Sequence, residues 1–480
     1  MLSSYHIRNL YLFSGLFLAF CLFAVYIDLL VLLAFPAVVL LGWILITKPK
    51  YIFYFLAFAT PLSVHLIEER YSSINLSLPT EPLIILLFIG GLLKLISAKK
   101  IDTTQFKTAL SILIIVDFSW LVVTAIFSTM PIISAKYIFM KAWYVAVFYF
   151  LATNFFADNR VVKKFIWAFV VSVIILCCYT LFIHAGGGFS RAYAYTAMRP
   201  FLPDHGMYAA CISFVVPILF VFALEGDKLG YKAPIRLFSL LLFLFMVFAV
   251  ALSFTRASWI SLVISLGVYF LFWLKIRFHF LAVLSMVLGG VLFSNLDNLL
   301  TDLSRNKKES DDNIENHLQS VSNVSSDPSN LERLNRWGSA FRMWEAKPIL
   351  GWGPGTYTFQ YGQFQLPHEM TIISTNAGTL GGVHSEYLRP LAESGIPGAI
   401  LFVLIVSFTF SLGFKHQRLL KGQDKYLSKA VFLALVTYFA HGVLNNYTEF
   451  DKIAVPLYSF LAVMTAIELK YQYAKKNTKK

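Results

Sequence analysis

Long apolar runs are the feature that most constrains how this chain can fold. A helix needs about 20 mostly apolar residues to cross the hydrocarbon core of a bilayer, and such runs recur between residues 9 and 470. Only 14% of the 480 residues are charged and 58% are hydrophobic, whereas an ordinary soluble domain carries about a quarter charged residues. A water-soluble globule of this size could not bury so much apolar surface. The sequence therefore predicts an all-α polytopic membrane protein.

The apolar runs predict twelve to fourteen spans, because the first three runs are closely spaced. The first run lacks a small-residue cleavage site and another run follows at once, so we expect a retained helix and not a signal peptide. The layout divides the chain into an N-terminal transmembrane bundle (1–296), a large polar segment (297–395) and C-terminal transmembrane helices (396–480). The fourteen candidate spans are residues 9–26, 28–47, 50–66, 81–98, 107–128, 137–156, 161–184, 206–224, 235–254, 257–274, 279–296, 396–414, 426–444 and 453–470.

Basic residues cluster in alternate connections between these spans, for example at Lys99, Lys100 and Lys107 and in the tail from Lys475 to Lys480. Cytoplasmic loops of membrane proteins carry the excess of lysine and arginine, so we expect these connections and both termini in the cytoplasm. The net charge of +14 is thereby assigned to orientation in the membrane, and nucleic-acid binding is not expected. The remaining connections, including the polar segment, are expected to face outward.

Cysteine and acidic residues give no sign of a disulfide framework or a metal site. The cysteines lie inside apolar runs, which argues against disulfides and a zinc ribbon; they are Cys21, Cys177, Cys178 and Cys211. The chain contains no DxD triplet. A Mg²⁺-dependent sugar transfer is therefore not expected, and we expect neither a metal nor a cofactor.

Several arginines lie in connections expected to face outward, where orientation does not explain them. Loop 185–205 carries Arg191 and Arg199 among glycines and tyrosines, a mixture suited to phosphate and sugar rings; contact with lipid headgroups is the alternative. Arg256, in SFTRASW, falls where two spans meet at the outer surface. Charge at membrane depth is costly and marks a pathway or a ligand site, although an arginine at a helix end can also snorkel.

The polar segment ends in an aromatic-rich part that predicts an amphipathic helix stopped by Pro348. Its apolar residues recur at spacings of three and four: Leu334, Trp337, Phe341 and Trp344. Arg333, Arg336 and Arg342 lie off this stripe, where they face either a cleft or solvent. The following GWGPG predicts a sharply turned loop.

His384 follows two glycines in the stretch GGVHSEYLRPLAESGIPG. Counted as a helix from His384, the residues Glu386, Arg389 and Glu393 share one face, so both glutamates could hold Arg389. Residues 395–398, which include Pro397, are expected to break the helix before the span. The short polar connection 441–451 could close one wall of the same cleft or form a simple polar turn.

Outward arginines beside one histidine imply a polyanion held at the membrane surface, and a lipid diphosphate fits because guanidinium groups pair bidentately with phosphate. Three motifs resemble those of the O-antigen ligase and polymerase superfamily of bacterial inner-membrane glycosyltransferases: TRASW, NRWGSAFRMWEAKPILGWGPGTY and HSEYLRPLAESGIPG. The resemblance implies a GT-C-like, metal-independent, inverting enzyme of the bacterial inner membrane with a periplasmic active site. It would transfer a glycan from undecaprenyl diphosphate to an acceptor hydroxyl.

The resemblance also implies roles for single residues. His384 looks like the histidine at the reaction centre, where it accepts or orients the proton of the attacking hydroxyl; helix capping is the alternative. Glu386 is the reserve base, with pairing to Arg389 as its alternative role. Arg256 looks like a diphosphate ligand, and Arg199 resembles a family arginine, although the PDHG that follows departs from the usual Asn-containing turn. Further candidate diphosphate ligands are Arg191, Arg336 and Arg389.

The sequence leaves the acceptor open. A ligase-like transfer to a lipid A core sugar is favoured because the block from HSEYL to GIPG resembles that domain best, while an O-antigen or exopolysaccharide polymerase and a protein O-oligosaccharyltransferase share the same chemistry. A lipid-linked oligosaccharide flippase is the alternative from another class, but no internal repeat is evident. The expected partners are the lipid-linked donor, a glycan or lipid A core acceptor and the bilayer. A chain-length regulator is a further candidate partner.

Overall fold

The computed structural model describes residues 4–27, 35–66, 76–97, 103–275, 328–371, 374 and 381–477. The predicted span 279–296 and the first part of the polar segment lie outside these residues. The chain separates into two compact units, Met1–Phe55 and Leu56–Lys480. All the site residues considered below belong to the second unit.

The N-terminal unit holds α1 (Ser4–Tyr26), α2 (Phe35–Thr47) and the beginning of α3 (Pro49–Ala59). The chain bends by 114° between α2 and the pair formed by α3 and η2 (Thr60–Leu62), which makes either one broken span or a re-entrant segment. Pro49 stands at the bend, where its missing N–H and fixed ring prevent the helix from continuing. The sequence predicts two separate spans at 28–47 and 50–66, whereas in the structure these segments form at most one span.

Nine helices among the described residues are long and apolar enough to cross a membrane, or up to ten if the bent pair is one span. They support an all-α, multi-pass membrane protein. The nine are α4 (Thr80–Ser97), α5 (Ala109–Ile126), the continuous run of α6 (Pro131–Tyr144), the π-helix η4 (Val145–Leu151) and α7 (Ala152–Phe155), α8 (Asn159–Gly186), α10 (His205–Glu225) with η5 (Gly226–Leu229), α11 (Ala233–Ala251), α12 (Arg256–Trp273), α18 (Leu388–Leu419) and α20 (Asp451–Asn477).

The predicted span 426–444 corresponds to α19 (Gly422–His441), which is not among these nine helices. Its first half carries three charged residues, Asp424, Lys425 and Lys429. Lys429 is paired with Glu225 at 2.7 Å. The helix is nevertheless enclosed by α10, α12, α18 and α20.

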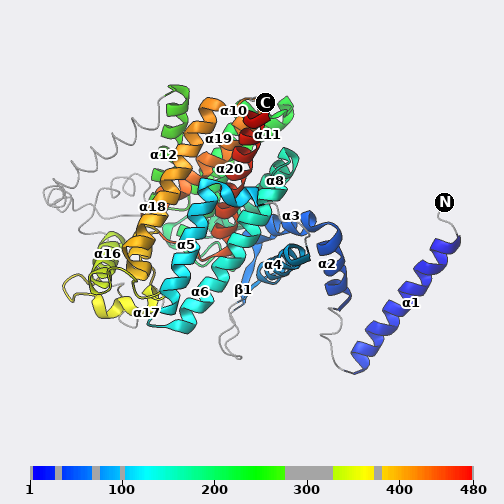
Figure 1. Ribbon diagram of the computed structural model, residues 1–480, viewed down its shortest axis with the longest axis horizontal. Helices are drawn as coiled ribbons and strands as arrows, with labels where there is room; N and C mark the ends of the chain where they lie inside the picture. The colour runs from blue at the N-terminus through cyan, green and yellow to red at the C-terminus, as the bar shows by residue number, and fades with distance from the viewer. Residues whose placement is uncertain are drawn as a thin grey trace. The chain divides into compact units, whose positions relative to one another are not determined.

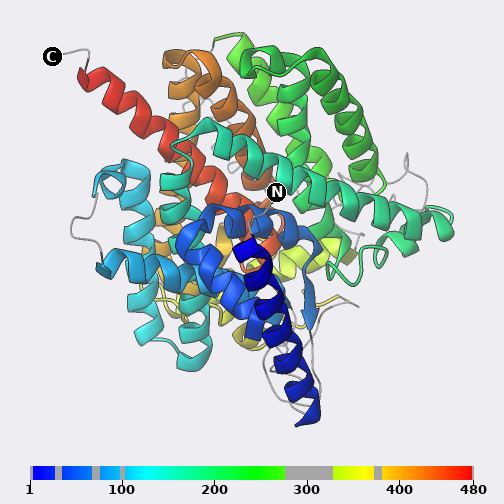
Figure 2. The ribbon, with the colours of Figure 1, turned by 90° about the vertical axis from the view of Figure 1, so that its right-hand side faces the viewer.

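Helices α10 and α20 form the centre of the second unit. Their apolar stretches are 83% and 89% buried, against 22% for α4, and a helix that is apolar on every face must be surrounded by others. Helix α10 packs against α11, α12 and α19, so the C-terminal helices lie beside the middle of the chain (Figures 1 and 2). The helices α10, α12, α18 and α20 begin, and α19 ends, at one end of this bundle, which we call the His384 end.

Short elements connect the spans. Strands β1 (Val64–Leu66) and β2 (Leu76–Leu78) pair antiparallel, with Val64 opposite Leu78 and Leu66 opposite Leu76. The other short pieces are η3 (Thr104–Lys107), α9 (Arg191–Ala194), α17 (Tyr357–Gln360) and η7 (Tyr361–Phe364).

The described part of the polar segment contains the predicted amphipathic helix, α16 (Pro328–Ala346), which ends before Pro348. Its apolar side packs with α17, η7 and the start of α18 around a small core made of Ala340, Met343, Tyr357, Tyr361, Val383 and Ala392. Leu334 and Phe341 of the same stripe remain 38% and 44% exposed. The polar segment therefore has a core of its own against the bundle.

Helix α18 is broken at Gly395, as the sequence predicts. Gly395 has φ 68° and ψ −170°, a conformation essentially confined to glycine. Because Pro397 has no N–H, the carbonyl of Glu393 lacks its helical donor, and the N–H of Gly353 donates to it instead at 2.9 Å. The N–H of Trp352 donates to the Ala392 carbonyl at 3.1 Å. The loop GWGPG is thus joined to the broken turn by main-chain bonds.

Candidate active site

His384 is held in an unusual backbone conformation just before α18. Its φ is +56°, which is uncommon outside glycine and excludes the helix that the sequence suggests for this position. The N–H of His384 donates to Asn446 Oδ1 at 2.8 Å, and its carbonyl accepts from Trp337 Nε1 at 3.4 Å. Such conformations cost about 1–3 kcal/mol and persist where the surroundings impose them, often at functional sites.

The imidazole of His384 is neutral at pH 7. Burial, together with the neighbouring cations Arg333 and Arg336, lowers the pKa of His384 to about 3, while a hydrogen bond with Asn445 opposes this shift. A neutral imidazole keeps one nitrogen as a hydrogen-bond acceptor. The side chain is therefore able to receive a proton or a hydroxyl hydrogen bond.

A chain of hydrogen bonds connects the surroundings of His384 with the first turn of α12. Asn445 Nδ2 donates to His441 Nε2 at 3.1 Å. The other ring nitrogen of His441 then carries the proton and donates to Ser258 Oγ at 3.2 Å. Ser258 follows Arg256, the first residue of α12, by two positions. The structure therefore places the arginine of TRASW and His384 at the same end of the bundle.

The first turns of α10 and α12 lie side by side at the His384 end. Asp204 caps α10 by accepting from Met207 N at 2.9 Å and also accepts from the Tyr447 hydroxyl at 3.3 Å. Thr255, which precedes α12, donates to the His205 carbonyl at 3.3 Å. The beginnings of two long helices thus face the same space, and the partial positive charge at helix N-termini favours an anion there.

Arg191 and Arg199 lie in the connection before α10. Arg191 Nε donates to the Tyr195 hydroxyl at 3.1 Å, and the Tyr195 ring packs edge-on against His205 with centroids 4.2 Å apart. Arg199 is exposed, and its carbonyl accepts from the Tyr179 hydroxyl at 2.7 Å. Arg191 is therefore linked to the start of α10 through one tyrosine.

Arg336 is buried and supports the residues before His384. It is 6% exposed, its Nε donates to Glu332 Oε1 at 2.6 Å, and its Nη1 donates to the Gly382 carbonyl at 3.1 Å. The guanidinium also lies 5.1 Å from the centre of the Tyr361 ring. Its charge is thus already matched by a carboxylate.

Arg333, His441 and Asn445 belong to the site although the sequence gave them no individual role. Arg333 Nε donates to the Leu444 carbonyl at 3.3 Å, which directs this arginine toward the connection 441–451. The polarity of that connection was the available signal, and the structure shows it forming one wall beside His384. For Arg333 the sequence predicts either a cleft or solvent, because helical periodicity does not show what covers a helix.

Glu386 ties the connection 441–451 to the residues after His384. Its Oε1 accepts from the Tyr438 hydroxyl at 2.6 Å and from the N–H groups of Tyr447 and Thr448 at 2.7 and 2.9 Å. Its Oε2 accepts from Thr448 Oγ1 at 2.9 Å. The carboxylate is thus occupied by four donors, none of which is Arg389.

Arg389 is buried between two other glutamates. Its Nε donates to Glu393 Oε2 at 3.1 Å, which is the pairing expected from their helical spacing, and its Nη2 donates to Glu449 Oε1. Burial raises the pKa of Glu449, although Arg389 opposes the rise. The guanidinium also stacks over Tyr137, with 5.0 Å to the ring centre.

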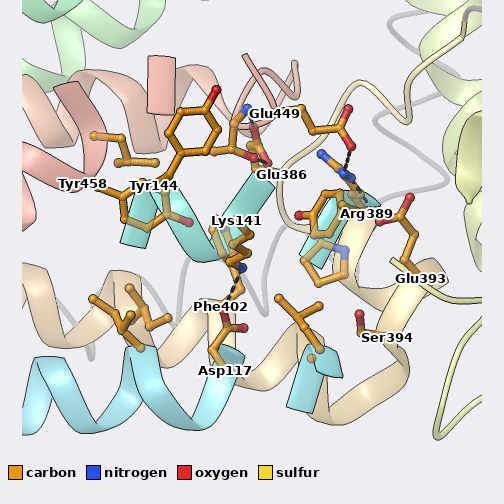
Figure 3. Close-up of a pocket in the computed structure, with 18 of the residues that line it drawn as sticks. Asp117, Lys141, Tyr144, Glu386, Arg389, Glu393, Ser394, Phe402, Glu449 and Tyr458 are labelled. Atoms are coloured by element: carbon orange, nitrogen blue, oxygen red, sulfur yellow. Dashed lines mark hydrogen bonds and ion pairs between the residues drawn. The ribbon is translucent and has the colours of Figure 1, made fainter. Parts of the chain in front are cut away.

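A cavity lies beside these ion pairs, between α5, α6, α18 and α20 (Figure 3). Its volume accessible to water is about 80 Å³, and it is partly open to the outside. Its charged lining residues are Asp117, Lys141, Glu386, Arg389, Glu393 and Glu449, and its apolar lining residues include Ile114, Phe402, Ile405 and Leu461. Lys141 and Asp117 are paired at 2.8 Å. Within the described part of the chain, no group of three His, Cys, Asp or Glu side chains is arranged to hold a metal ion.

Fold and site together define a multi-pass membrane protein with cations, helix N-termini and a neutral imidazole gathered at one end of its bundle. Residues 241–403 match the family model described as O-antigen ligase, and no curated protein matches the chain. The match begins within α11, contains α12 and the polar segment and ends within α18, and so includes Arg256, Arg336 and His384. The match covers about a third of the chain, and it supports the resemblance to the O-antigen ligase and polymerase superfamily of glycan-transfer enzymes that the sequence motifs predict.

Proposed function

We propose that this protein transfers a glycan from undecaprenyl diphosphate to an acceptor hydroxyl at the periplasmic face of the bacterial inner membrane, as an O-antigen ligase does. The observation that supports the proposal is the hydrogen-bonded chain from Ser258 through His441 to Asn445, because the start of α12 and His384 then lie at the same end of the bundle. The family match supports the reaction class. As the basic connections in the sequence predict, we assign both termini to the cytoplasm. For the C-terminal helices the assignment is supported by Arg418 in the last turn of α18 and Lys421 just before α19, opposite the His384 end.

The donor diphosphate binds at the N-terminus of α12. Arg256 pairs with phosphate oxygens, and the backbone N–H groups and dipole of the helix add to the attraction. Arg191 and Arg199 approach from the neighbouring connection. These groups stabilise the negative charge that grows on the diphosphate as it leaves, without a metal or a cofactor.

His384 receives the proton of the acceptor hydroxyl. The hydroxyl oxygen attacks the anomeric carbon from the side opposite the diphosphate, so one carbon–oxygen bond forms, the bond to the diphosphate breaks and the configuration inverts. The low pKa of His384 reflects burial next to Arg333 and Arg336. A bound diphosphate offsets these cations and raises the pKa toward the range in which a general base works.

Three predicted site residues take supporting roles in this proposal. Arg336 holds the Gly382 carbonyl and is paired with Glu332, and Arg389 is shared by Glu393 and Glu449. Glu386 is saturated by donors from the connection 441–451. We therefore assign Arg336, Arg389 and Glu386 to positioning His384, not to binding the diphosphate or acting as reserve base.

The test is reconstitution of the protein in liposomes with a lipid-linked glycan donor and three acceptors: lipid A core, a second lipid-linked glycan and a peptide. H384A should abolish transfer and R256A should weaken donor binding, whereas H368A and R418A, which alter an exposed histidine and an exposed arginine elsewhere, should behave like the wild type. A glycan found on the second lipid-linked chain identifies a polymerase, and one found on the peptide a protein glycosylating enzyme. Passage of the donor across the bilayer without a new bond, or full activity of H384A, would overturn the proposal.

A further inference from the structure

The cavity beside Arg389 does not suit a diphosphate. Four of its lining residues are acidic, Asp117, Glu386, Glu393 and Glu449, and only two are basic, Lys141 and Arg389. Both cations are already paired with carboxylates. A further anion would meet net repulsion in a site partly shielded from water. The ligand of this cavity is therefore not an anion.

Two buried polar groups in the cavity lining have no hydrogen-bond partner among the residues that the structure describes. They are Arg389 Nη1 and Ser394 Oγ, on residues that are 4% and 1% exposed, and both residues line the cavity (Figure 3). A buried donor without an acceptor is destabilising, and native proteins leave few such groups unpaired. These two groups mark where a ligand makes its bonds.

The rest of the lining narrows the chemistry of that ligand. Arg389 Nη1 can only donate, the carboxylates of Glu393 and Glu449 accept, and Ser394 can do either. Tyr137, Tyr144 and Tyr458 add aromatic surface to the walls. A sugar ring satisfies all of these groups, because its hydroxyls both donate and accept while its C–H faces pack on aromatic rings.

We propose that this cavity binds one neutral sugar ring of a glycan substrate. The inference rests on the proposed function, and it adds a sugar-binding subsite that is separate from the diphosphate site at α12. Glu386 and Thr448 line the cavity and are bonded to each other at 2.9 Å, within the segments that also hold His384. A sugar ring in the cavity therefore lies next to the chain segment that contains His384, the proposed base.

The variant Ser394→Ala removes a contact to the ligand without removing a hydrogen bond within the described protein. Its hydroxyl makes no bond to the described protein, so its loss should leave the melting temperature unchanged. Ser459→Ala is the matched control, because Ser459 Oγ is also buried without a partner but does not line the cavity. Saturation-transfer NMR of the full-length protein in nanodiscs, with the methyl glycosides of glucose, galactose, mannose, rhamnose and N-acetylglucosamine, measures binding directly.

At least one glycoside should bind the wild type and S459A equally and S394A about tenfold more weakly, the loss expected for one hydrogen bond. E449Q should weaken the same glycoside. In transfer assays, S394A should raise the KM of one glycan substrate with little change in kcat, and the substrate affected, acceptor or donor, identifies which one supplies the ring. Failure of the wild type to bind any of these glycosides, or equal binding by S394A and S459A, would overturn the subsite.

The two proposals fail in different ways. If the wild type transfers no glycan but binds a glycoside in a way that depends on Ser394, the subsite stands and the proposed reaction falls. If transfer occurs while S394A matches S459A in both binding and KM, the reaction stands and the subsite falls.

Discussion

Replacing Glu386 by Gln and by Ala distinguishes a structural carboxylate from a catalytic one. In E386A the Tyr438 hydroxyl and the N–H groups of Tyr447 and Thr448 lose their acceptor. At roughly 1–3 kcal/mol for each unsatisfied donor, the loss sums to roughly 3–9 kcal/mol, and water entering from the adjoining cavity favours the lower end. We expect E386A to lose both stability and transfer.

E386Q keeps most of these bonds. The amide oxygen can still accept from Tyr438, Tyr447 and Thr448 N–H, and the amide NH₂ can donate to Thr448 Oγ1 in place of accepting from it. Only the charge assistance is lost, which is worth about 1 kcal/mol for each bond. E386Q should therefore melt a few degrees below the wild type and retain most of its transfer activity.

The assay pairs melting of the purified protein, followed by intrinsic fluorescence, with transfer in liposomes. E345Q, at an exposed glutamate of α16, controls for the loss of one negative charge. If E386Q were as inactive as E386A while both melted like the wild type, Glu386 would be a base, and the structural role inferred from its four donors would be wrong.

Three further predictions concern other parts of the site. G353A should lower the melting temperature and transfer by a destabilisation of about 2–4 kcal/mol, because φ is +109° there and the new Cβ would lie 2.0 Å from Ser128 Oγ; G267A, with nothing within 4 Å of its Cβ, should be neutral. R333A should raise the pKa of His384 in an NMR titration, since Arg333 is a cation that lowers it; an unchanged pKa would contradict this. The pKa of His384 is about 3 in the folded protein, below its ordinary value of 6.5. Its contribution to stability is therefore present above pH 6.5 and is lost as pH falls toward 3, and H384Q should flatten that part of the stability profile.

Features set by local patterns could be predicted from the sequence. Apolar run length predicts α10 and α20, a spacing of three and four predicts α16, and the glycines around Pro397 predict the break in α18. The bend of 114° between α2 and α3 was missed because run length does not show direction. The prediction that the helix begins at His384 was also wrong. Its positive φ goes with contacts to Asn446 and Trp337, two residues that are far from His384 in the sequence.

The site was predicted only in outline for the same reason. Their expected outward position and their charge made Arg256 and His384 candidates in the sequence. The hydrogen bond between His441 and Ser258, however, joins residues 183 positions apart, and a periodic pattern in the sequence cannot predict such a contact. Likewise, the charge of Arg336 was visible in the sequence, whereas its pairing with Glu332 and its bond to Gly382 follow from how α16 packs. Packing between elements decides which cations remain available to a substrate.

The junction between GWGPG and α18 has a consequence for how the polar segment can vary. Its donors and acceptors are main-chain atoms of Trp352, Gly353, Ala392 and Glu393, so most side chains in the loop can change without loosening it. Removal of a single residue from the loop, by contrast, would move each amide away from its carbonyl. Divergent sequences can therefore keep the same attachment as long as the number of residues between the two partners is preserved.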